Sequence, residues 1–77
     1  MGVTVYSTTW CPYCKMAKEF LSQHKISFED INVEKDSGKA EEMIEKSGQQ
    51  GVPVIDIDGK IIVGFDREAL RQALKIS

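Results

Sequence analysis

Two cysteines, Cys11 and Cys14, are the residues of this sequence best suited to chemistry, and they enclose Pro12 and Tyr13. The chain contains no other cysteine. A disulfide between them would close a loop of only four residues, and a loop that short is expected to contribute roughly 2 kcal/mol at most. Such a bridge would stabilise the fold little, so the sequence indicates a chemical and not a structural role for the pair.

The expected position of the pair gives the two thiols different roles. Residues 2–7 are rich in β-forming side chains and predict a strand, whereas a helical spacing begins at Pro12. Cys11 would then lie at a helix N-terminus, where free N–H groups and the helix dipole favour a thiolate. Cys14 would lie on the same face, shielded by the first turn. We expect an exposed Cys11 to attack disulfides and Cys14 to resolve the mixed disulfide.

Metal binding is the main alternative for a Cys-x-x-Cys pair. A tetrahedral zinc site takes four ligands, and the only histidine, His24, is expected to be exposed at a helix end. A zinc site or an iron–sulfur cluster would therefore need a second chain, so a metal or cluster that bridges a dimer stays open. Copper(I) transfer through the Cys-x-x-Cys loop is a further option. A redoxin-like binding module without turnover is a third alternative.

Length and composition restrict the other function classes. A chain of 77 residues has room for one domain, 1–77. Its 10 basic and 12 acidic residues give a net charge of −2 without a long run of like charges, so we expect no nucleic-acid partner. We expect neither a membrane span nor a signal peptide, and hence a cytoplasmic protein. In that reducing compartment a Cys-x-x-Cys pair is more often catalytic or metal-binding than structural.

The spacing of apolar and turn residues predicts seven elements in the order β-α-β-α-β-β-α. Strands are predicted at 2–7, 26–33, 52–57 and 60–63, and helices from Pro12 to about Lys25, from Asp36 or Ser37 to Gly48, and after Asp66. Asp58 and Gly59 predict a tight hairpin between the last two strands. The first strand, helix and second strand predict a right-handed parallel crossover. The expected fold is an α/β four-stranded mixed sheet flanked by three helices.

Apolar side chains at helical and strand spacing are assigned to the core. Val3 and Val5 share one face of the first strand, and further core residues are expected at Met16, Phe20, Phe28 and Met43. The charged side chains on the first helix, at Lys15, Lys18 and Glu19, are assigned to a solvated face.

Three short motifs resemble those of the glutaredoxin family, the small version of the thioredoxin-like fold. They are Cys-Pro-Tyr-Cys at 11–14, Gly-Val-Pro-Val at 51–54 and Gly-Phe-Asp at 64–66. The resemblance covers nearly the whole chain and implies a cis proline at Pro53 beside the redox pair. It also implies that the Val52 backbone pairs with a peptide-like substrate and that Tyr13 flanks bound glutathione.

The chain also departs from the family's glutathione-binding pattern. Thr8 stands where many glutaredoxins carry a basic residue, and Val63 replaces the first glycine of a Gly-Gly pair. Gln49 can serve in the loop before the Val-Pro pair, and Asp66 can take the amino end of glutathione. The substrate- and glutathione-binding residues that the resemblance implies are Thr8, Tyr13, Gln49, Val52, Pro53, Gly64, Phe65 and Asp66.

Together, the residues and the resemblance predict a thiol–disulfide oxidoreductase that uses Cys11 and Cys14 as a dithiol. Its expected substrates are disulfide-containing proteins or mixed disulfides with glutathione. No bound cofactor is expected, and glutathione is the expected co-substrate. The pair at Gly64 and Phe65 resembles instead redoxins that take electrons from thioredoxin reductase, so that donor is the alternative. We expect the protein to act as a monomer.

Overall fold

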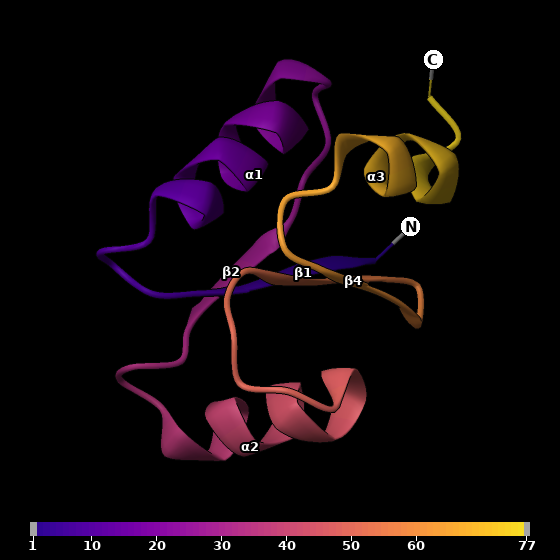
Figure 1. Ribbon diagram of the computed structural model, residues 1–77. Coiled ribbons are helices and arrows are strands. Elements are labelled where there is room, and N and C mark those ends of the chain that lie inside the picture. The colour runs from indigo at the N-terminus through magenta and orange to yellow at the C-terminus, as the bar shows by residue number, and fades with distance from the viewer. Residues whose placement is uncertain (1, 77) are drawn as a thin grey trace.

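The computed structural model describes residues 2–76 and contains the seven elements in the predicted order (Figure 1). The four strands are β1 (Val3–Ser7), β2 (Glu29–Asn32), β3 (Val54–Ile57) and β4 (Lys60–Val63), and the three helices are α1 (Pro12–Gln23), α2 (Ser37–Ser47) and α3 (Arg67–Leu74). Within the described residues, none of these helices is both long enough and apolar enough to cross a membrane.

The strands form one mixed sheet in the order β2-β1-β3-β4. β1 pairs in parallel with β2 and antiparallel with β3, and β3 pairs antiparallel with β4. The predicted α/β fold is therefore confirmed, including the parallel crossover through α1. Because β1 is a central strand, the loop that follows it leaves the middle of the sheet and leads directly into the cysteine pair.

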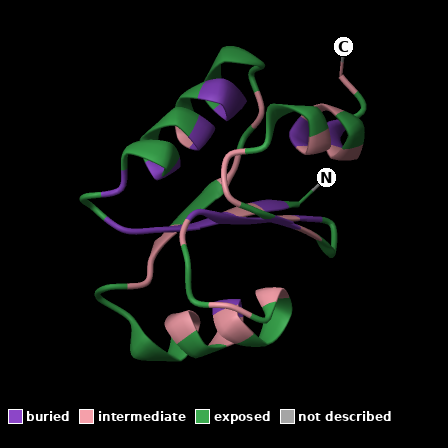
Figure 2. Ribbon diagram, viewed as in Figure 1, coloured by how far each residue is buried: buried purple, intermediate pink, exposed green. Residues whose placement is uncertain are grey.

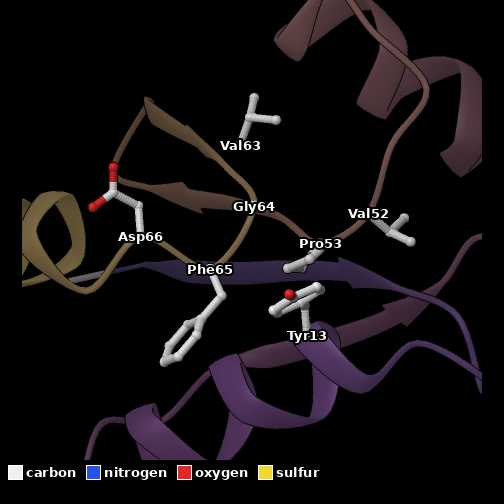
Figure 3. A pocket seen from close by; sticks show the side chains of 7 residues that line it. All are labelled: Tyr13, Val52, Pro53, Val63, Gly64, Phe65 and Asp66. Carbon is white, nitrogen blue, oxygen red and sulfur yellow. The ribbon is translucent and has the colours of Figure 1, made fainter.

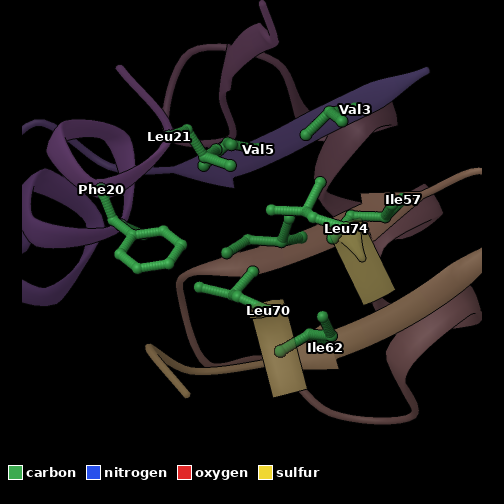
Figure 4. Close-up of a cluster of buried hydrophobic side chains, with 10 residues drawn as sticks. Val3, Val5, Phe20, Leu21, Ile57, Ile62, Leu70 and Leu74 are labelled. Carbon is green, nitrogen blue, oxygen red and sulfur yellow. The ribbon is translucent and has the colours of Figure 1, made fainter. Parts of the chain in front are cut away.

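Helices cover both faces of the sheet, with α1 and α3 on one side and α2 on the other (Figure 1). The larger core lies beneath α1 and α3, where Phe20, Leu21, Leu70 and Leu74 meet side chains of the strands (Figure 4). A smaller core beneath α2 is built from Tyr6, Met43 and Val54. Buried residues accordingly line the sheet and the inner sides of the helices, and the outer sides are exposed (Figure 2).

The ends of the elements follow local sequence signals. The Asp36 and Asp66 carboxylates cap α2 and α3 by accepting backbone N–H bonds of 3.1 Å, each from the residue three positions on. Gly48 ends α2 in the left-handed conformation. Asp58 and Gly59 both have positive φ, as a two-residue hairpin turn with the twist of the strands requires.

Three strands are shorter than predicted, and β1 is shorter by a single residue, because it begins at Val3. β2 spans Glu29–Asn32 and not 26–33, and as an edge strand it pairs only with residues 4–7 of β1. β3 begins at Val54 and not at 52. Pro53 has no N–H to give to the sheet, and the Val52–Pro53 peptide bond is cis.

The core assignment of Met16 is wrong. The buried side of α1 consists of Cys14, Ala17, Phe20 and Leu21, and Met16 lies off that stripe with 40% of its surface exposed. Phe20 and Met43 are buried as predicted, Phe28 packs against the core while partly exposed, and His24 is exposed.

Candidate active site

The cysteine pair lies at the junction between β1 and α1. Cys11 is the residue that caps α1, and its sulfur accepts the backbone N–H of Cys14 at 3.1 Å. Pro12 occupies the first helical position, where its missing N–H costs no hydrogen bond. The helix therefore directs an N–H group and the positive end of its dipole at the Cys11 sulfur.

Burial distinguishes the two thiols less strongly than the sequence suggests. Cys11, expected at an exposed helix tip, retains only 8% of its surface, whereas Cys14 retains none. The Cys11 thiol lies 3.8 Å from the Val52 carbonyl oxygen, the geometry of a long S–H···O hydrogen bond. The segment before β3 thus covers part of Cys11, but Cys11 is still the more accessible of the two free thiols.

The surroundings of Cys14 keep it protonated. Burial away from water, followed by its hydrogen bond with Cys11, raises the pKa of Cys14 to about 12. The backbone N–H of Thr8 and the charge of Lys18 act in the opposite direction but are the smaller causes. Cys14 is therefore a thiol at neutral pH, as a residue that reacts second should be.

An open pocket is lined by Tyr13, which stands between the two cysteines in sequence, and by Val52, whose carbonyl oxygen lies 3.8 Å from the Cys11 sulfur (Figure 3). It has a volume of about 340 Å³, at the lower end of the range typical of small-molecule sites. The ring of Tyr13, from the first turn of α1, faces Pro53, with Val52 on one side and Phe65 on the other. Gly64, with a φ of +81°, turns the chain from β4 towards α3 at the edge of the pocket.

Six of the eight residues implied by the family resemblance meet in this pocket. They are Tyr13, Val52, Pro53, Gly64, Phe65 and Asp66, and the seventh lining residue is Val63. One Asp66 carboxylate oxygen caps α3, and the carboxylate points away from Tyr13 in the view of Figure 3.

The other two, Thr8 and Gln49, do not line the pocket. Thr8 is buried, with 8% of its surface exposed. The Gln49 side chain folds back on its own loop, where it accepts from the Gly51 N–H at 2.6 Å and donates to the Gly51 carbonyl at 3.0 Å. Loop conformation, which residue spacing does not determine, therefore separates these two residues from the rest.

The residues suited to metals are not assembled around the cysteines. His24 lies at the opposite end of α1 from Cys11 and packs against the ring of Phe20 at 4.5 Å between centroids. Among residues 2–76, no group of three or more His, Cys, Asp or Glu side chains is placed to hold a metal ion.

One group of contacts at the site has no counterpart in the sequence analysis. Glu34, in the loop after β2, binds the loop that leads to Cys11 through Thr9 and Trp10. No motif marks Glu34, because its role depends on two loops that are 24 or more residues apart in sequence.

Comparison with known proteins agrees with this geometry. The sequence profile of the glutaredoxin family matches residues 3–62. The chain belongs to the glutaredoxin family. Glutaredoxins are thiol–disulfide oxidoreductases, and this chain supplies the dithiol of such an enzyme in Cys11 and Cys14.

Similar proteins include a glutaredoxin and proteins described as glutaredoxin-like. A glutaredoxin-like 8.6 kDa protein from the rubredoxin operon of Clostridium pasteurianum is 47% identical, over 95% of this chain and 97% of its own length. Glutaredoxin 3 of Escherichia coli K12 is 42% identical, over 84% of this chain and 78% of its own. The glutaredoxin-like protein NrdH of Lactococcus lactis is 43% identical, over 82% and 86%.

Solved structures match the fold of this glutaredoxin closely. A mutant of the thioredoxin-like protein BC3987 superposes with a TM-score of 0.91 at 32% identity, covering 97% of this chain and 96% of the other. The NrdH-redoxin of Escherichia coli, described as having a thioredoxin-like activity profile, superposes with a TM-score of 0.85 at 25% identity, covering 94% and 93%.

Proposed function

We propose that this glutaredoxin reduces protein disulfides and mixed glutathione disulfides, with glutathione as its electron donor. One observation carries the proposal. The Cys11 sulfur accepts a helix N-terminal N–H at 3.1 Å and lies beside the Val52 carbonyl, next to an open pocket. A nucleophilic sulfur is thereby placed at the edge of a space that a peptide-like thiol can fill.

The first step is attack by the Cys11 thiolate on one sulfur of the substrate disulfide. The substrate S–S bond breaks, one sulfur leaves as a thiolate, and the other forms a mixed disulfide with Cys11. The Val52 backbone, next to the cis Pro53 bond, is suited to pair with the chain that carries the attacked sulfur.

The second step is attack by Cys14 on the Cys11 sulfur. Once the Cys11 sulfur is bonded in the mixed disulfide, its hydrogen bond with Cys14 no longer raises the pKa of Cys14, and burial is the main cause that is left. Cys14 thus loses its proton more readily at the stage when it must attack. The second substrate sulfur leaves as a thiol, a Cys11–Cys14 disulfide forms, and two electrons have passed to the substrate.

Glutathione is then proposed to return the protein to the dithiol form, becoming glutathione disulfide. Tyr13 would flank the bound tripeptide, and the Val52 backbone would pair with it. Its amino end would approach Asp66 at the start of α3. These residues line a single pocket, which is why glutathione is the donor we favour.

A second donor, a flavoprotein of the thioredoxin reductase type, is favoured by the charge of the pocket. Its lining contains one charged residue, the anionic Asp66, and no cation to pair with the glycine carboxylate of glutathione. Thr8, where many family members have a basic residue, is buried outside the pocket. Both features weaken glutathione binding without affecting the cysteine chemistry.

Reduction of the oxidised protein by each donor separates the two proposals. The protein is incubated with insulin as the disulfide substrate and NADPH, together with either glutathione and glutathione reductase or thioredoxin reductase. NADPH oxidation only with glutathione and glutathione reductase supports our proposal. NADPH oxidation only with thioredoxin reductase would show that the reductase, and not glutathione, is the donor. Failure of both arms, or visible absorbance of the fresh protein from an iron–sulfur cluster, would overturn the proposed activity. The Cys11→Ser variant is the blank.

A further inference from the structure

Glu34 binds the loop before the cysteine pair through three hydrogen bonds. Its Oε1 accepts the backbone N–H of Thr9 at 2.9 Å and the Thr9 hydroxyl at 2.8 Å, and its Oε2 accepts the indole N–H of Trp10 at 3.1 Å. Both carboxylate oxygens are therefore occupied by donors from two consecutive residues. These bonds, those from Thr9 above all, lower the pKa of Glu34, so its side chain is ionised at neutral pH. Hydrogen bonds to a charged acceptor are stronger than those between neutral groups.

Glu34 is itself held in place by its own loop. Its backbone N–H donates to the Asn32 side chain at 2.9 Å, where β2 ends. The loop after β2 and the loop between β1 and α1 lie at the same end of the molecule (Figure 1). Because β1 and β2 are parallel neighbours, their C-terminal loops are close, and Glu34 joins them immediately before Cys11.

The indole of Trp10 is held in this way although most of it faces solvent. Trp10 retains 70% of its surface and directly precedes Cys11. The large apolar side chains exposed within residues 2–76 are Trp10, Tyr13, Met16 and Val63, and Tyr13 and Val63 line the pocket beside Cys11. Tryptophan is enriched at protein interfaces, because its large ring is apolar and its N–H can be satisfied by a hydrogen bond.

Because Trp10 lies outside the pocket, small and macromolecular disulfide substrates should differ in how far they depend on it. The pocket is lined from Tyr13 and from segments 52–53 and 63–66, without Trp10. A small disulfide that fills only the pocket does not need the indole. A folded or partly folded protein that brings its disulfide to Cys11 must cover the adjoining surface, which includes Trp10.

We propose that Glu34 is a positioning residue that fixes Trp10 as a contact for macromolecular disulfide substrates. The inference rests on the proposed thiol–disulfide exchange and adds to it the side chain that favours protein substrates. A side chain fixed before binding loses less conformational entropy on binding, so the carboxylate contributes to affinity without touching the substrate.

The test compares Glu34→Gln with Glu45→Gln, a matched change at an exposed position of α2. In Glu34→Gln one of the two acceptor oxygens becomes an NH₂ group and the charge is lost. KM is measured for insulin and for hydroxyethyl disulfide with the same donor. We expect the ratio of the insulin KM to the small-disulfide KM to rise roughly threefold to tenfold in Glu34→Gln, the size of a weakened contact, and to stay at the wild-type value in Glu45→Gln.

Trp10 is the only tryptophan, so its fluorescence anisotropy reports the fixing of the indole directly. We expect lower anisotropy in Glu34→Gln than in wild type and Glu45→Gln. Trp10→Phe, which keeps an aromatic ring but has no N–H, should raise the same KM ratio. Combining it with Glu34→Gln should add little, because the two changes act on one contact.

The outcomes distinguish this inference from the proposed function. If wild type reduces both disulfides but neither Glu34→Gln nor Trp10→Phe changes the KM ratio, the role of Glu34 is wrong and the activity stands. Fully additive effects in the double variant would also overturn it, because Glu34 would then act independently of Trp10. Should Glu34→Gln lose the wild-type circular dichroism spectrum, Trp10→Phe alone decides between these results. If wild type reduces neither disulfide, the proposed function itself fails.

Discussion

At the scale of single residues, one hydrogen bond, from the Cys14 N–H to the Cys11 sulfur, supports the order in which we propose that the two thiols react. It directs a helix N-terminal N–H at the Cys11 sulfur, while burial, with the Cys11 contact second, raises the pKa of Cys14 to about 12. Two identical side chains three positions apart therefore differ in reactivity because one caps the helix and the other lies inside its first turn.

The Cys14→Ser variant should form a stable mixed disulfide with substrate, because Cys11 still attacks but no second thiol is present to release it. Mass spectrometry after exposure to glutathione disulfide should show one added glutathione. Cys11→Ser should show none at neutral pH, since Cys14 is buried and protonated. The assignment of attacking and resolving cysteines is reversed if Cys11→Ser is the variant that gains the adduct.

The Val63→Gly variant should bind glutathione roughly twofold to tenfold more tightly, because Val63 is half exposed and its branched side chain borders the pocket. Titration of glutathione into a Cys14→Ser background, followed by amide chemical shifts, measures this. Lys60→Ala, at the exposed first residue of β4 and outside the pocket, is the control. Weaker binding in Val63→Gly would mean that the valine contributes an apolar contact. A lysine at Thr8 is not expected to help, because Thr8 is buried outside the pocket.

At the scale of elements, α1 is the helix that positions both cysteines, and its two ends are built differently. Its first turn begins with the Cys11 cap and Pro12. At its other end, Lys25 adopts a left-handed conformation with φ of +57°, and the Ile26 N–H bonds the Leu21 carbonyl at 2.9 Å. This closing geometry is usual for a glycine and strained for a lysine.

Replacement of Lys25 by glycine should therefore raise the free energy of unfolding, by about 0.5–1 kcal/mol, since glycine removes the steric cost but adds chain entropy to the unfolded state. Urea denaturation measures the change. The matched control is Lys15→Gly, at an exposed interior position of α1, which should lower stability by about 1 kcal/mol. A loss of stability in both variants would show that the left-handed lysine carries no strain.

At the scale of the whole molecule, a polar network attaches α2 to the sheet on the side opposite the cysteine-bearing helix. The Lys46 ammonium donates to the Tyr6 hydroxyl at 2.9 Å and to the Asp56 carboxylate at 2.8 Å, and the Tyr6 hydroxyl donates to Glu42. Lys46 therefore connects α2 with both β1 and β3. The hydrogen bond from Lys46 is the main cause that lowers the pKa of Asp56.

Loss of this network in Lys46→Met should lower stability at pH 7 by about 1–2 kcal/mol, a modest figure because Lys46 is about one-third exposed. Since the folded-state pKa of Asp56 is lowered, its contribution is present above the unfolded value of about 3.9 and is lost as pH falls through the folded value. The wild-type and variant unfolding free energies should therefore converge below about pH 3.9. Denaturation series between neutral and acid pH measure this.

The control for that prediction is Lys39→Met on the same helix. Lys39 forms an exposed ion pair with Glu42 at 3.6 Å, and such pairs contribute about 0–1 kcal/mol. Equal losses for the two lysine variants at every pH would mean that Asp56 and Tyr6 do not depend on Lys46.

The features that the sequence determined by itself are local ones. Pro12, Asp36 and Asp66 mark helix starts because a missing N–H or a carboxylate acts on the adjoining turn. Asp58 and Gly59 determine a hairpin because two adjacent residues must adopt positive φ. The same short-range signals place the cysteine pair at the junction between a strand and a helix. The expected thiol–disulfide chemistry follows from that position.

Tertiary structure decided what depends on partners distant in the chain. The residues of β2 are those that pair with residues 4–7 of β1. The Val52 carbonyl that covers part of Cys11 lies 41 residues away in sequence. Thr8 and Gln49 lie outside the pocket because burial and loop hydrogen bonds direct them elsewhere. Glu34 reaches Trp10 only because two parallel strands end side by side. Residue type and spacing carry no information on such contacts, since they depend on how the elements pack and how the loops close.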